Sequence, residues 1–352
     1  MSDSKEQIFR VLPRQADETI AAALREWLPG KSWSDVRRLL KSRRVMVSGN
    51  LCDDERLRLR MKDVVKLLEN PLPAPAQEHD VRIRHLDVHV VVVEKPAGVT
   101  STRHDDESGL PARKRQIQPT LDELLPRLIA KVERGGRGGG SQGSQRGVKG
   151  GEAGGKSSPR PVRPVHRLDR ETSGLMVFAR TAKAQQHLEH QFRLHTIERR
   201  YLAVVEGEIT EPFTIESRLV RDRGDGRRGS TPLPDVGKHA VTHVRPVEQL
   251  GDYTLIECRL ETGRTHQIRI HLAESGHPLC GDKVYRQPLF RPGKPDKSHA
   301  PRLALCAVEL GFIHPATEQP MHFEMPLSRD LAEFVRKLRA RISRPGQGGG
   351  SC

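Results

Sequence analysis

The chain has 352 residues and a mass of 39.5 kDa, a length typical of about two domains. Lysine and arginine number 60 against 45 acidic residues, so the formal net charge is +15, and no apolar run reaches the roughly 18 residues of a membrane helix. These values exclude an integral membrane protein and predict a polyanionic partner, most simply nucleic acid.

The cysteines and the N-terminus predict a reducing, cytoplasmic location without membrane association. The five cysteines are scattered and form no CxxC pair: Cys52, Cys258, Cys280, Cys306 and Cys352. This argues against a disulfide framework and against a zinc site. The first ten residues, MSDSKEQIFR, contain no apolar stretch of the kind that a secretory signal requires.

Residues 10–70 predict a compact helix–helix–hairpin unit. Apolar residues at helical spacing predict a helix over 17–27 and a second helix over 34–42 that begins at a capping Ser34. Alternating apolar residues then predict strands, over 45–47, 57–62 and 64–68 in turn.

The second of these helices and the turn after it are strongly basic. The candidate RNA-contacting residues there are Arg37, Arg38, Lys41, Arg43 and Arg44. The unit resembles the S4-type RNA-binding module, which implies RNA contacts at these positions. A solvated helix face is the alternative, because charged side chains commonly just face water.

Composition predicts how the rest of the chain is divided. The Pro-rich segment 71–79 is a predicted linker, 80–342 a catalytic domain and 343–352 a flexible tail. Residues 134–158 are rich in glycine and basic, so we expect a disordered insertion within the domain. It is either an RNA-binding arm or a surface insertion without a role.

The second domain shows many strand patterns and few helices. In the first half we expect a strand within 85–101 ending at Lys95, a helix over 121–132 capped by Thr120 and interrupted or kinked near Pro126, a loop from 164 into the strand LMVFA, and a helix over 181–195. After these we expect a strand over 199–209, a long polar loop over 217–242, a strand, turn and helix over 253–282, a strand pair over 303–315 and a helix over 331–342. Within 253–282, Thr265 is the predicted helix cap and Gly276 the stop, with Ile268, His271 and Leu272 on one face. This pattern predicts an α+β fold with a mixed, largely antiparallel sheet, flanking helices and a central cleft.

Asp169 is the candidate for chemistry. Arg167 and Arg170 flank it in a loop before a strong strand, and guanidinium neighbours favour an ionised carboxylate that can act as a nucleophile. By residue chemistry alone, a loop salt bridge is the more common fate of such an aspartate.

The sequence around this aspartate carries a motif. HRLDRETSG (166–174), followed by LMVFART, resembles the active-site signature of the large-subunit-rRNA type, or RluA-type, pseudouridine synthases. Three further matches follow the family's order: EKPAGV (94–99), RRYLAVVEG (199–207) and ETGRTHQIRIHLAESGHPLCGDKVY (261–285). The resemblance spans roughly 80–330, and an S4-like module in front is a common arrangement in this family.

The resemblance implies roles for particular residues. Asp169 would start the isomerisation of a uridine, in which the N1–C1′ bond breaks and the base rejoins through C5. Tyr201 would pack on the flipped base and can take the C5 proton, Arg269 would pair with Asp169, and Arg167 would fill the space that the uridine leaves. From the residues alone, Tyr201 is more often a core tyrosine, and Arg269 more often a surface cation.

The remaining candidates are contacts to RNA. His166, Arg170, Arg264 and His266 lie in or beside the matching motifs and are predicted to bind RNA. His266 and His271 are five residues apart and do not share a helix face, so no metal site is predicted, and the family uses no cofactor. The family often has lysine before the active-site tyrosine, where this chain has Arg200.

The sequence therefore predicts an RNA pseudouridine synthase, an isomerase, acting as a monomer on structured RNA. The expected substrate is large-subunit (23S-type) rRNA, with tRNA as the alternative and with no DNA partner. Two other functions remain open: a catalytically inactive RNA-binding or ribosome-assembly protein, and a nucleosidase or glycosylase that releases the free base.

Overall fold

The computed structural model describes residues 7–48, 50–69, 71–72, 77–103, 119–135, 161–286 and 295–342. The chain separates into two compact units, an N-terminal unit within residues 1–75 and a catalytic unit within residues 76–352. The predicted Gly-rich insertion, apart from its first two residues, and the predicted C-terminal tail lie outside the described residues.

The N-terminal unit is a small sheet with two helices. Its strands are ordered β1-β4-β2-β3, and every pairing is antiparallel. The elements are β1 (Gln7–Arg10), η1 (Pro13–Gln15), α1 (Ile20–Trp27), α2 (Trp33–Lys41), β2 (Val45–Val47), β3 (Asn50–Leu51) and β4 (Val64–Leu67). Ile20, Leu24, Val36 and Leu40 from the helices pack against Val65 to form its core.

Two predictions for this unit were wrong in detail. The second helix is capped by Ser32, whose hydroxyl accepts from the Asp35 amide at 3.1 Å while the Asp35 carboxylate accepts from the Ser32 amide at 3.0 Å, so Ser34 lies inside the helix. Residues 57–62 form no strand beyond a single bridge at Arg58. Their backbone bonds instead to the start of α1, with Leu59 accepting from Asp17 at 2.9 Å.

The catalytic unit is built on one mixed sheet, which confirms the α+β prediction. Its order is β11-β10-β12-β13-β9-β14-β8-β6-β5, with β15 paired to β14 and β7 to β8. The pairing of β14 with β8 is parallel, whereas the other pairings are antiparallel. The strands are β5 (Arg82–Leu86), β6 (Val90–Lys95), β7 (Arg163–Pro164), β8 (Ser173–Ala179), β9 (Glu198–Glu206), β10 (Phe213–Val220), β11 (Gly229–Thr231), β12 (Lys238–Gln249), β13 (Tyr253–Leu260), β14 (Leu305–Ile313) and β15 (Pro320–Glu324).

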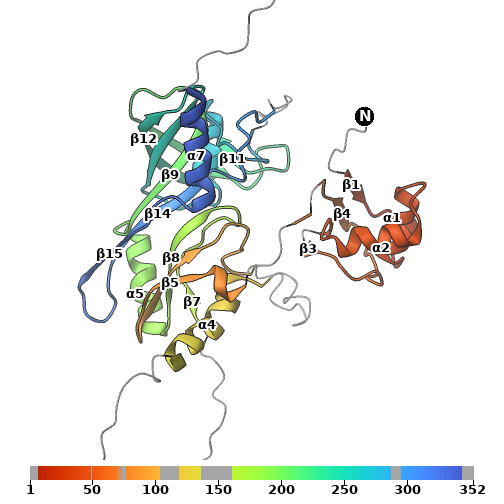
Figure 1. The fold of residues 1–352 in the computed structure, drawn as a ribbon, viewed down its shortest axis with the longest axis horizontal. Coiled ribbons are helices and arrows are strands. Elements are labelled where there is room, and N and C mark those ends of the chain that lie inside the picture. Colours follow the sequence, from red (N-terminus) through yellow and green to blue (C-terminus); the bar gives the residue numbers. More distant parts are fainter. Residues whose placement is uncertain are drawn as a thin grey trace, which may run out of the picture. The chain divides into compact units, whose positions relative to one another are not determined.

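Helices cover both faces of this sheet (Figure 1). They are η2 (Glu78–Asp80), α4 (Leu121–Gly135), α5 (Ala182–Arg193), α6 (Gln267–Glu274) and α7 (Arg329–Ile342). Alternation along β9 shows the two sides: Tyr201, Ala203 and Val205 pack in the core cluster that includes α4 and α6, while Leu202 and Val204 pack in the cluster that includes α7.

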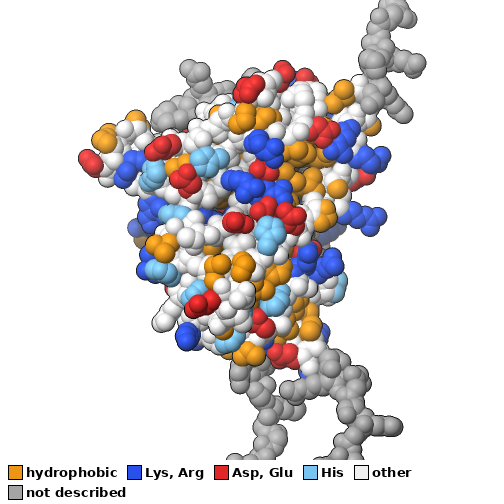
Figure 2. All heavy atoms as spheres, turned by 90° about the vertical axis from the view of Figure 1, so that its left-hand side faces the viewer, with side chains coloured by type: hydrophobic (Ala, Val, Ile, Leu, Met, Phe, Trp, Pro, Cys, Tyr) orange, Lys and Arg blue, Asp and Glu red, His pale blue; other side chains and the backbone are white. Residues whose placement is uncertain are grey.

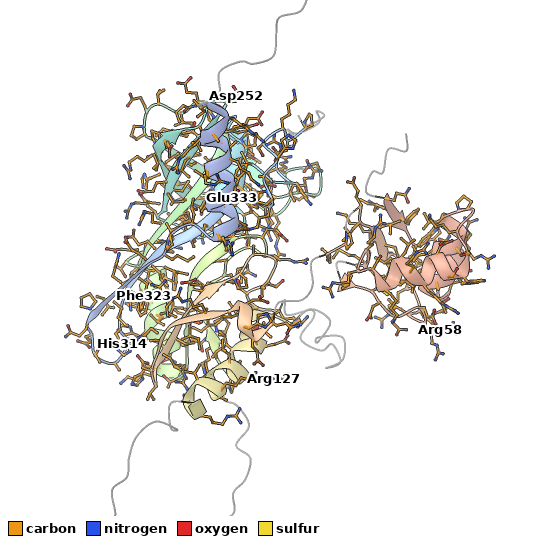
Figure 3. All side chains as sticks on the ribbon, viewed as in Figure 1. Arg58, Arg127, Asp252, His314, Phe323 and Glu333 are labelled. Atoms are coloured by element: carbon orange, nitrogen blue, oxygen red, sulfur yellow. The ribbon has the colours of Figure 1, made fainter. Side chains whose placement is uncertain are left out.

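The β14–β15 hairpin is held by a contact to the turn between β5 and β6 and by a contact between its own two strands. His314, just after β14, brings its Nε2 to 3.0 Å from the Asp87 carboxylate in the turn between β5 and β6. Phe323 on β15 stacks on Phe312 of β14 with ring centroids 6.1 Å apart, and His314 and Phe323 are labelled in Figure 3.

Other predictions for the catalytic unit need correction. The predicted polar loop over 217–242 is wrong, because it contains β11, the end of β10 and the start of β12, with β10 paired to both of the others. The predicted strand pair over 303–315 is the single strand β14, and its partner β15 follows later. The helix α4 is not interrupted at Pro126 but continues to Gly135, and Leu125 and Ile129 on both sides of the proline are buried in the core.

The helix α6 also differs from its prediction. It starts after His266, which adopts a left-handed φ of 60°, rather than at a capping Thr265. Residues 267–272 are all buried, so the helix has no solvent-facing side there and crosses the interior of the unit. Gly276, with φ of +89°, follows its end as predicted.

Candidate active site

The signature loop, residues 166–174, is fastened to the turn that follows β6. Lys95, 1% exposed, donates from Nζ to the carbonyls of Val99 at 2.7 Å, Pro96 at 3.0 Å and Arg170 at 3.0 Å. The amide of Gly98 donates to the same Arg170 carbonyl at 2.8 Å. Burial lowers the pKa of Lys95 to about 7. The EKPAGV and HRLDRETSG motifs therefore form one folded unit, with Lys95 as its buried link.

Gly174 lets the end of the signature loop enter the sheet. Its φ is +128°, and a Cβ at this position would lie 2.2 Å from the carbonyl oxygen of Ala307 on β14. No side chain fits there, because β8 and β14 pair directly at this point. The glycine thus determines where the loop that carries Asp169 joins strand β8.

The signature loop, β9 and the turn before α6 enclose a cavity of about 720 Å³. This volume lies within the range of small-ligand sites, which is roughly 300–1,000 Å³. Asp169, Tyr201 and Arg269 all line it, although they are far apart in the sequence. The structure therefore brings the three predicted catalytic residues together.

Arg269 is held between two carboxylates. Its Nε and Nη2 donate to the Asp282 carboxylate at 2.8 and 3.0 Å, and its Nη1 lies 3.5 Å from Asp169 Oδ2. Burial acts to lower the pKa of Arg269 and to raise the pKa of Asp282. The hydrogen bonds between the two side chains outweigh this effect, so the pKa of Arg269 is raised and the pKa of Asp282 is lowered. Asp282 is thus the main partner of Arg269, and it was missing from the sequence prediction.

His266 lines the cavity beside Asp169, and Tyr285 supports it from behind. His266 Nδ1 is hydrogen-bonded to the Tyr285 hydroxyl at 2.7 Å, and its Nε2 faces Asp169 Oδ1 at 3.9 Å. The ring of Tyr285 lies under the Arg269 guanidinium, 5.1 Å from its central carbon. Burial lowers the pKa of His266 and raises that of Tyr285 to about 12. His266 is therefore a neutral neighbour of Asp169 at pH 7.

Strand β9 places Tyr201 and Arg199 on the cavity side. Tyr201 is 7% exposed and belongs to the main core cluster, so the core interpretation and the active-site interpretation both apply to it. Burial raises the pKa of its phenol. Arg200 points to the other face, where it pairs with Glu309 and with Glu324 at 3.0 Å. The sequence singled out Arg200, but Arg199 is the arginine that lines the cavity.

The other residues predicted around the site have different surroundings. Arg167 is exposed and reaches Thr265 across the cavity mouth at 3.4 Å. Arg264 is exposed and donates to the His239 carbonyl at 2.9 Å, whereas Arg170 donates to Gly98 at 3.1 Å within the loop contact. Arg167 and Arg264 thus form a basic rim at the cavity.

His166 serves the loop rather than presenting a charge. Its Nε2 accepts from the Val177 amide at 3.1 Å, and its ring stacks on Phe192 at 4.7 Å. Burial, together with the nearby Arg199, lowers the pKa of His166 to about 3, so the ring is neutral at pH 7.

The basic residues of the N-terminal unit are partly engaged within it. Arg37 pairs with Glu55 at 2.8 Å and Arg38 with Asp35 at 2.5 Å. Arg43 and Arg44 donate to the carbonyls of Leu72 at 3.3 Å and Leu68 at 2.8 Å. These hydrogen bonds hold the segment that follows β4 against the unit. Lys41 is exposed.

Within the described residues, one group has metal-ligand geometry: Glu198, Glu309 and His322. It lies away from the cavity, and Arg200 already occupies Glu309. Figure 2 shows that on one face of the molecule cations lie interleaved with Asp, Glu and His rather than in one continuous basic patch.

A mixed sheet with a carboxylate and several cations around a nucleotide-sized cavity defines an enzyme for a polyanionic substrate.

A family model described as RNA pseudouridylate synthase matches residues 89–274. The ribosomal large subunit pseudouridine synthase D of Zymomonas mobilis subsp. mobilis is 33% identical over 304 residues, covering 82% of this chain and 84% of the relative. That of Xanthomonas campestris pv. campestris is 32% identical over 337 residues, covering 93% and 90%.

Among solved structures, human RNA pseudouridylate synthase domain containing 4 shares the fold, with a TM-score of 0.54 at 22% identity, covering 73% of this chain and 93% of that one. The chain belongs to the RNA pseudouridylate synthase family and is an isomerase that converts uridine in RNA to pseudouridine. None of the described helices has the length and apolar character needed to cross a bilayer.

Proposed function

We propose that this protein isomerises specific uridines of large-subunit rRNA, with Asp169 as the catalytic carboxylate acting on a nucleotide flipped into the cavity. One observation carries the proposal: Asp169 lines a cavity of about 720 Å³ together with Tyr201, and Arg269 lies 3.5 Å from its carboxylate. The relatives named as large-subunit synthases support rRNA as the substrate.

The reaction needs a carboxylate beside the sugar and base. The N1–C1′ bond breaks, the base rotates, the C5–C1′ bond forms and the C5 proton leaves. Asp169 can attack the base, attack the sugar or remove a sugar proton, and each of these steps requires its ionised form. Because a stacked uridine cannot reach an enclosed carboxylate, the nucleotide must leave its helix.

The neighbouring residues have complementary roles in this proposal. Arg269, held by Asp282, keeps the Asp169 carboxylate oriented toward the cavity. Tyr201 packs on the base and is the candidate to take the C5 proton. Arg167 at the mouth occupies the place of the flipped uridine, and Arg264 on the rim contacts phosphate.

The test measures tritium release from RNA labelled at C5 of uridine. We expect release from a large-subunit rRNA transcript, and loss of release in Asp169→Asn with RNA binding retained. The matched control is Glu171→Gln, which changes a neighbouring exposed carboxylate that does not line the cavity. Full activity in Asp169→Asn would remove this residue from the mechanism, free uracil would indicate a nucleosidase, and release from tRNA alone would overturn the rRNA assignment.

The N-terminal unit adds a second proposed RNA contact. Lys41 is exposed, and Arg37 and Arg38 lie on the same helix with exposed side chains that can exchange their carboxylate partners for phosphates. We expect a full-length variant with these three residues changed to alanine to bind RNA more weakly and with a smaller salt dependence. An unchanged salt dependence would contradict the proposal.

The proposed enzyme acts as a cytoplasmic monomer and does not bind DNA.

A further inference from the structure

Arg199 is a buried cation in the wall of the cavity, and the described part of the chain gives it no counter-ion. Its side chain leaves β9 beside Tyr201, and the residue is 9% exposed. Nη2 makes only long hydrogen bonds, to the carbonyls of Leu260 at 3.4 Å and Glu261 at 3.5 Å, and the buried Nε makes none. Among the residues that the structure describes, no carboxylate forms an ion pair with Arg199.

The surroundings of this guanidinium are neutral. The ring of Phe192 lies 5.5 Å from its central carbon, and His166 behind that ring is uncharged at pH 7. Burial lowers the pKa of Arg199, and Tyr201, whose phenol is neutral at pH 7, is the one titratable group that acts in the opposite direction. The positive charge is therefore buried without compensation from any residue that the structure describes.

The fold has adapted to keep this cation in place. A Cβ on Gly263, in the turn before α6, would lie 2.8 Å from Arg199 Nη1. The absence of a side chain there lets the turn close over the guanidinium. Arg200, the next residue, shows the usual arrangement, since its guanidinium is surrounded by the carboxylates of Glu257, Glu309 and Glu324. Buried charges are normally paired, so an enclosed unpaired cation points to a ligand that supplies the negative charge.

We infer that Arg199 is a further catalytic residue, which donates hydrogen bonds to a carbonyl oxygen of the flipped uracil and stabilises the negative charge that develops on the base. This inference rests on the proposed function. When the N1–C1′ bond breaks, the base keeps both electrons, and the charge spreads over N1 and the two carbonyl oxygens. The sugar carbon left electron-poor faces the Asp169 carboxylate. The same electrons then form the C5–C1′ bond, the C5 proton leaves, and N1 takes up a proton.

This role explains why the cation is left unpaired. A carboxylate beside Arg199 would neutralise it before the reaction and repel the anionic base. A donor fixed in a water-poor cavity contributes most where charge appears only in the transition state, and removing such a donor typically lowers kcat by about 10²–10³-fold. An unpaired buried charge contributes nothing to the stability of the fold. Arg199 should therefore lower the free energy of unfolding while it increases the rate of the reaction.

The experiment combines kinetics with thermal unfolding of the full-length protein. In Arg199→Met we expect kcat for tritium release to fall by about 10²–10³-fold with little change in KM. We expect the melting temperature of the catalytic unit, followed by circular dichroism, to stay equal to wild type or rise. Arg199→Lys, which retains a charge in the cavity, should recover part of kcat. The matched control is Arg259→Met, an arginine on the neighbouring strand that pairs with Glu257 on the opposite face.

The outcomes separate this inference from the proposed function. Unchanged kcat in Arg199→Met, or a loss of activity that parallels a fall in melting temperature, would overturn the proposed role of Arg199. Neither result would bear on the proposed role of Asp169. Retained activity in Asp169→Asn, together with lost activity in Arg199→Met, would overturn the role of Asp169 and support Arg199. If the wild-type protein releases no tritium, the melting temperature decides. A lower melting temperature in Arg199→Met would refute the inference that Arg199 is an unpaired buried charge, and a higher melting temperature would support it.

Discussion

Replacing Asp282 by asparagine should destabilise the catalytic unit far more than replacing Asp169, although both carboxylates contact Arg269. Asp282 is buried and binds the guanidinium twice, at 2.8 and 3.0 Å, whereas Asp169 lies 3.5 Å away at the cavity surface. Asparagine keeps an oxygen for the amides of Val284 and Tyr285, which Asp282 accepts at 2.8 and 3.1 Å. Asp282→Asn therefore removes the charge while the local turn retains its hydrogen bonds.

The magnitude follows from the burial of the pair. Removing one partner of a buried ion pair leaves an uncompensated charge and typically lowers the free energy of unfolding by about 3–5 kcal/mol. Asp169 remains near Arg269 and offsets part of the loss, so we expect a value near the lower limit, about 3 kcal/mol. Asp169→Asn leaves the Asp282 pair intact, and we expect a change of less than about 1 kcal/mol.

Two spectroscopic signals make this test specific. Both tryptophans, Trp27 and Trp33, belong to the N-terminal unit, so tryptophan fluorescence reports its unfolding alone. Circular dichroism also follows the catalytic unit. We expect Asp282→Asn to move the urea transition seen by circular dichroism and to leave the fluorescence transition in place. Equal destabilisation by Asp169→Asn and Asp282→Asn would refute the assignment of Asp282 as the principal partner.

The same pair gives a pH dependence. The pKa of Asp282 is lower in the folded protein than in the unfolded chain. Its stabilising contribution is therefore fully present above the ordinary carboxyl value of about 3.9 and is lost as the pH falls through the folded-state pKa. The difference in stability between wild type and Asp282→Asn should shrink below about pH 4. A difference that stays constant on acidification would contradict this reasoning.

Three further outcomes are expected. Gly174→Ala should lower the melting temperature strongly because its Cβ would lie 2.2 Å from the Ala307 carbonyl, whereas Gly224→Ala, which carries the same kind of backbone strain (φ +111°) but meets open space, should lower it much less; equal effects would contradict the close approach. Arg167→Ala should reduce the slope of log K against log salt by about 0.7–0.9 in filter binding if it contacts one phosphate, and an unchanged slope would exclude that contact. Tyr201→Phe should keep the melting temperature and lose tritium release, since only a hydroxyl is removed, and full activity would assign the C5 proton to another base.

The residues that sequence located best lie in continuous motifs. HRLDRETSG fixed the position of Asp169, and its resemblance to a known signature led to Tyr201 and Arg269 before their proximity could be seen. Local patterns likewise predicted the helix that became α5, because Thr181 caps it by accepting from the Ala184 amide at 3.1 Å. Local rules worked where the interactions themselves are local.

The errors arose where tertiary contacts replace local ones. A helix such as α6, with an arginine, a histidine and a glutamate among eight residues, resembles a surface helix. Its residues 267–272 are nevertheless buried, because Asp282 and Thr242 supply partners for Arg269 and His271. Those partners are 13 and 29 residues away from the residues they bind. Sequence spacing does not reveal such pairs, so the burial of a charged helix could not be anticipated.

The two arginines before Tyr201 show how one structural rule could have improved the prediction. Side chains two residues apart in a strand share a face, so Arg199 must lie on the side of Tyr201, and Arg200 on the other. Once β9 was predicted as a strand, that alternation already favoured Arg199 as the cavity cation. What the alternation does not supply is the pairing state: three carboxylates from different strands surround Arg200, while none reaches Arg199 among the described residues. The contrast between a neutralised charge at Arg200 and an unpaired one at Arg199, and with it the assignment of a catalytic role, depends on the register of the whole sheet.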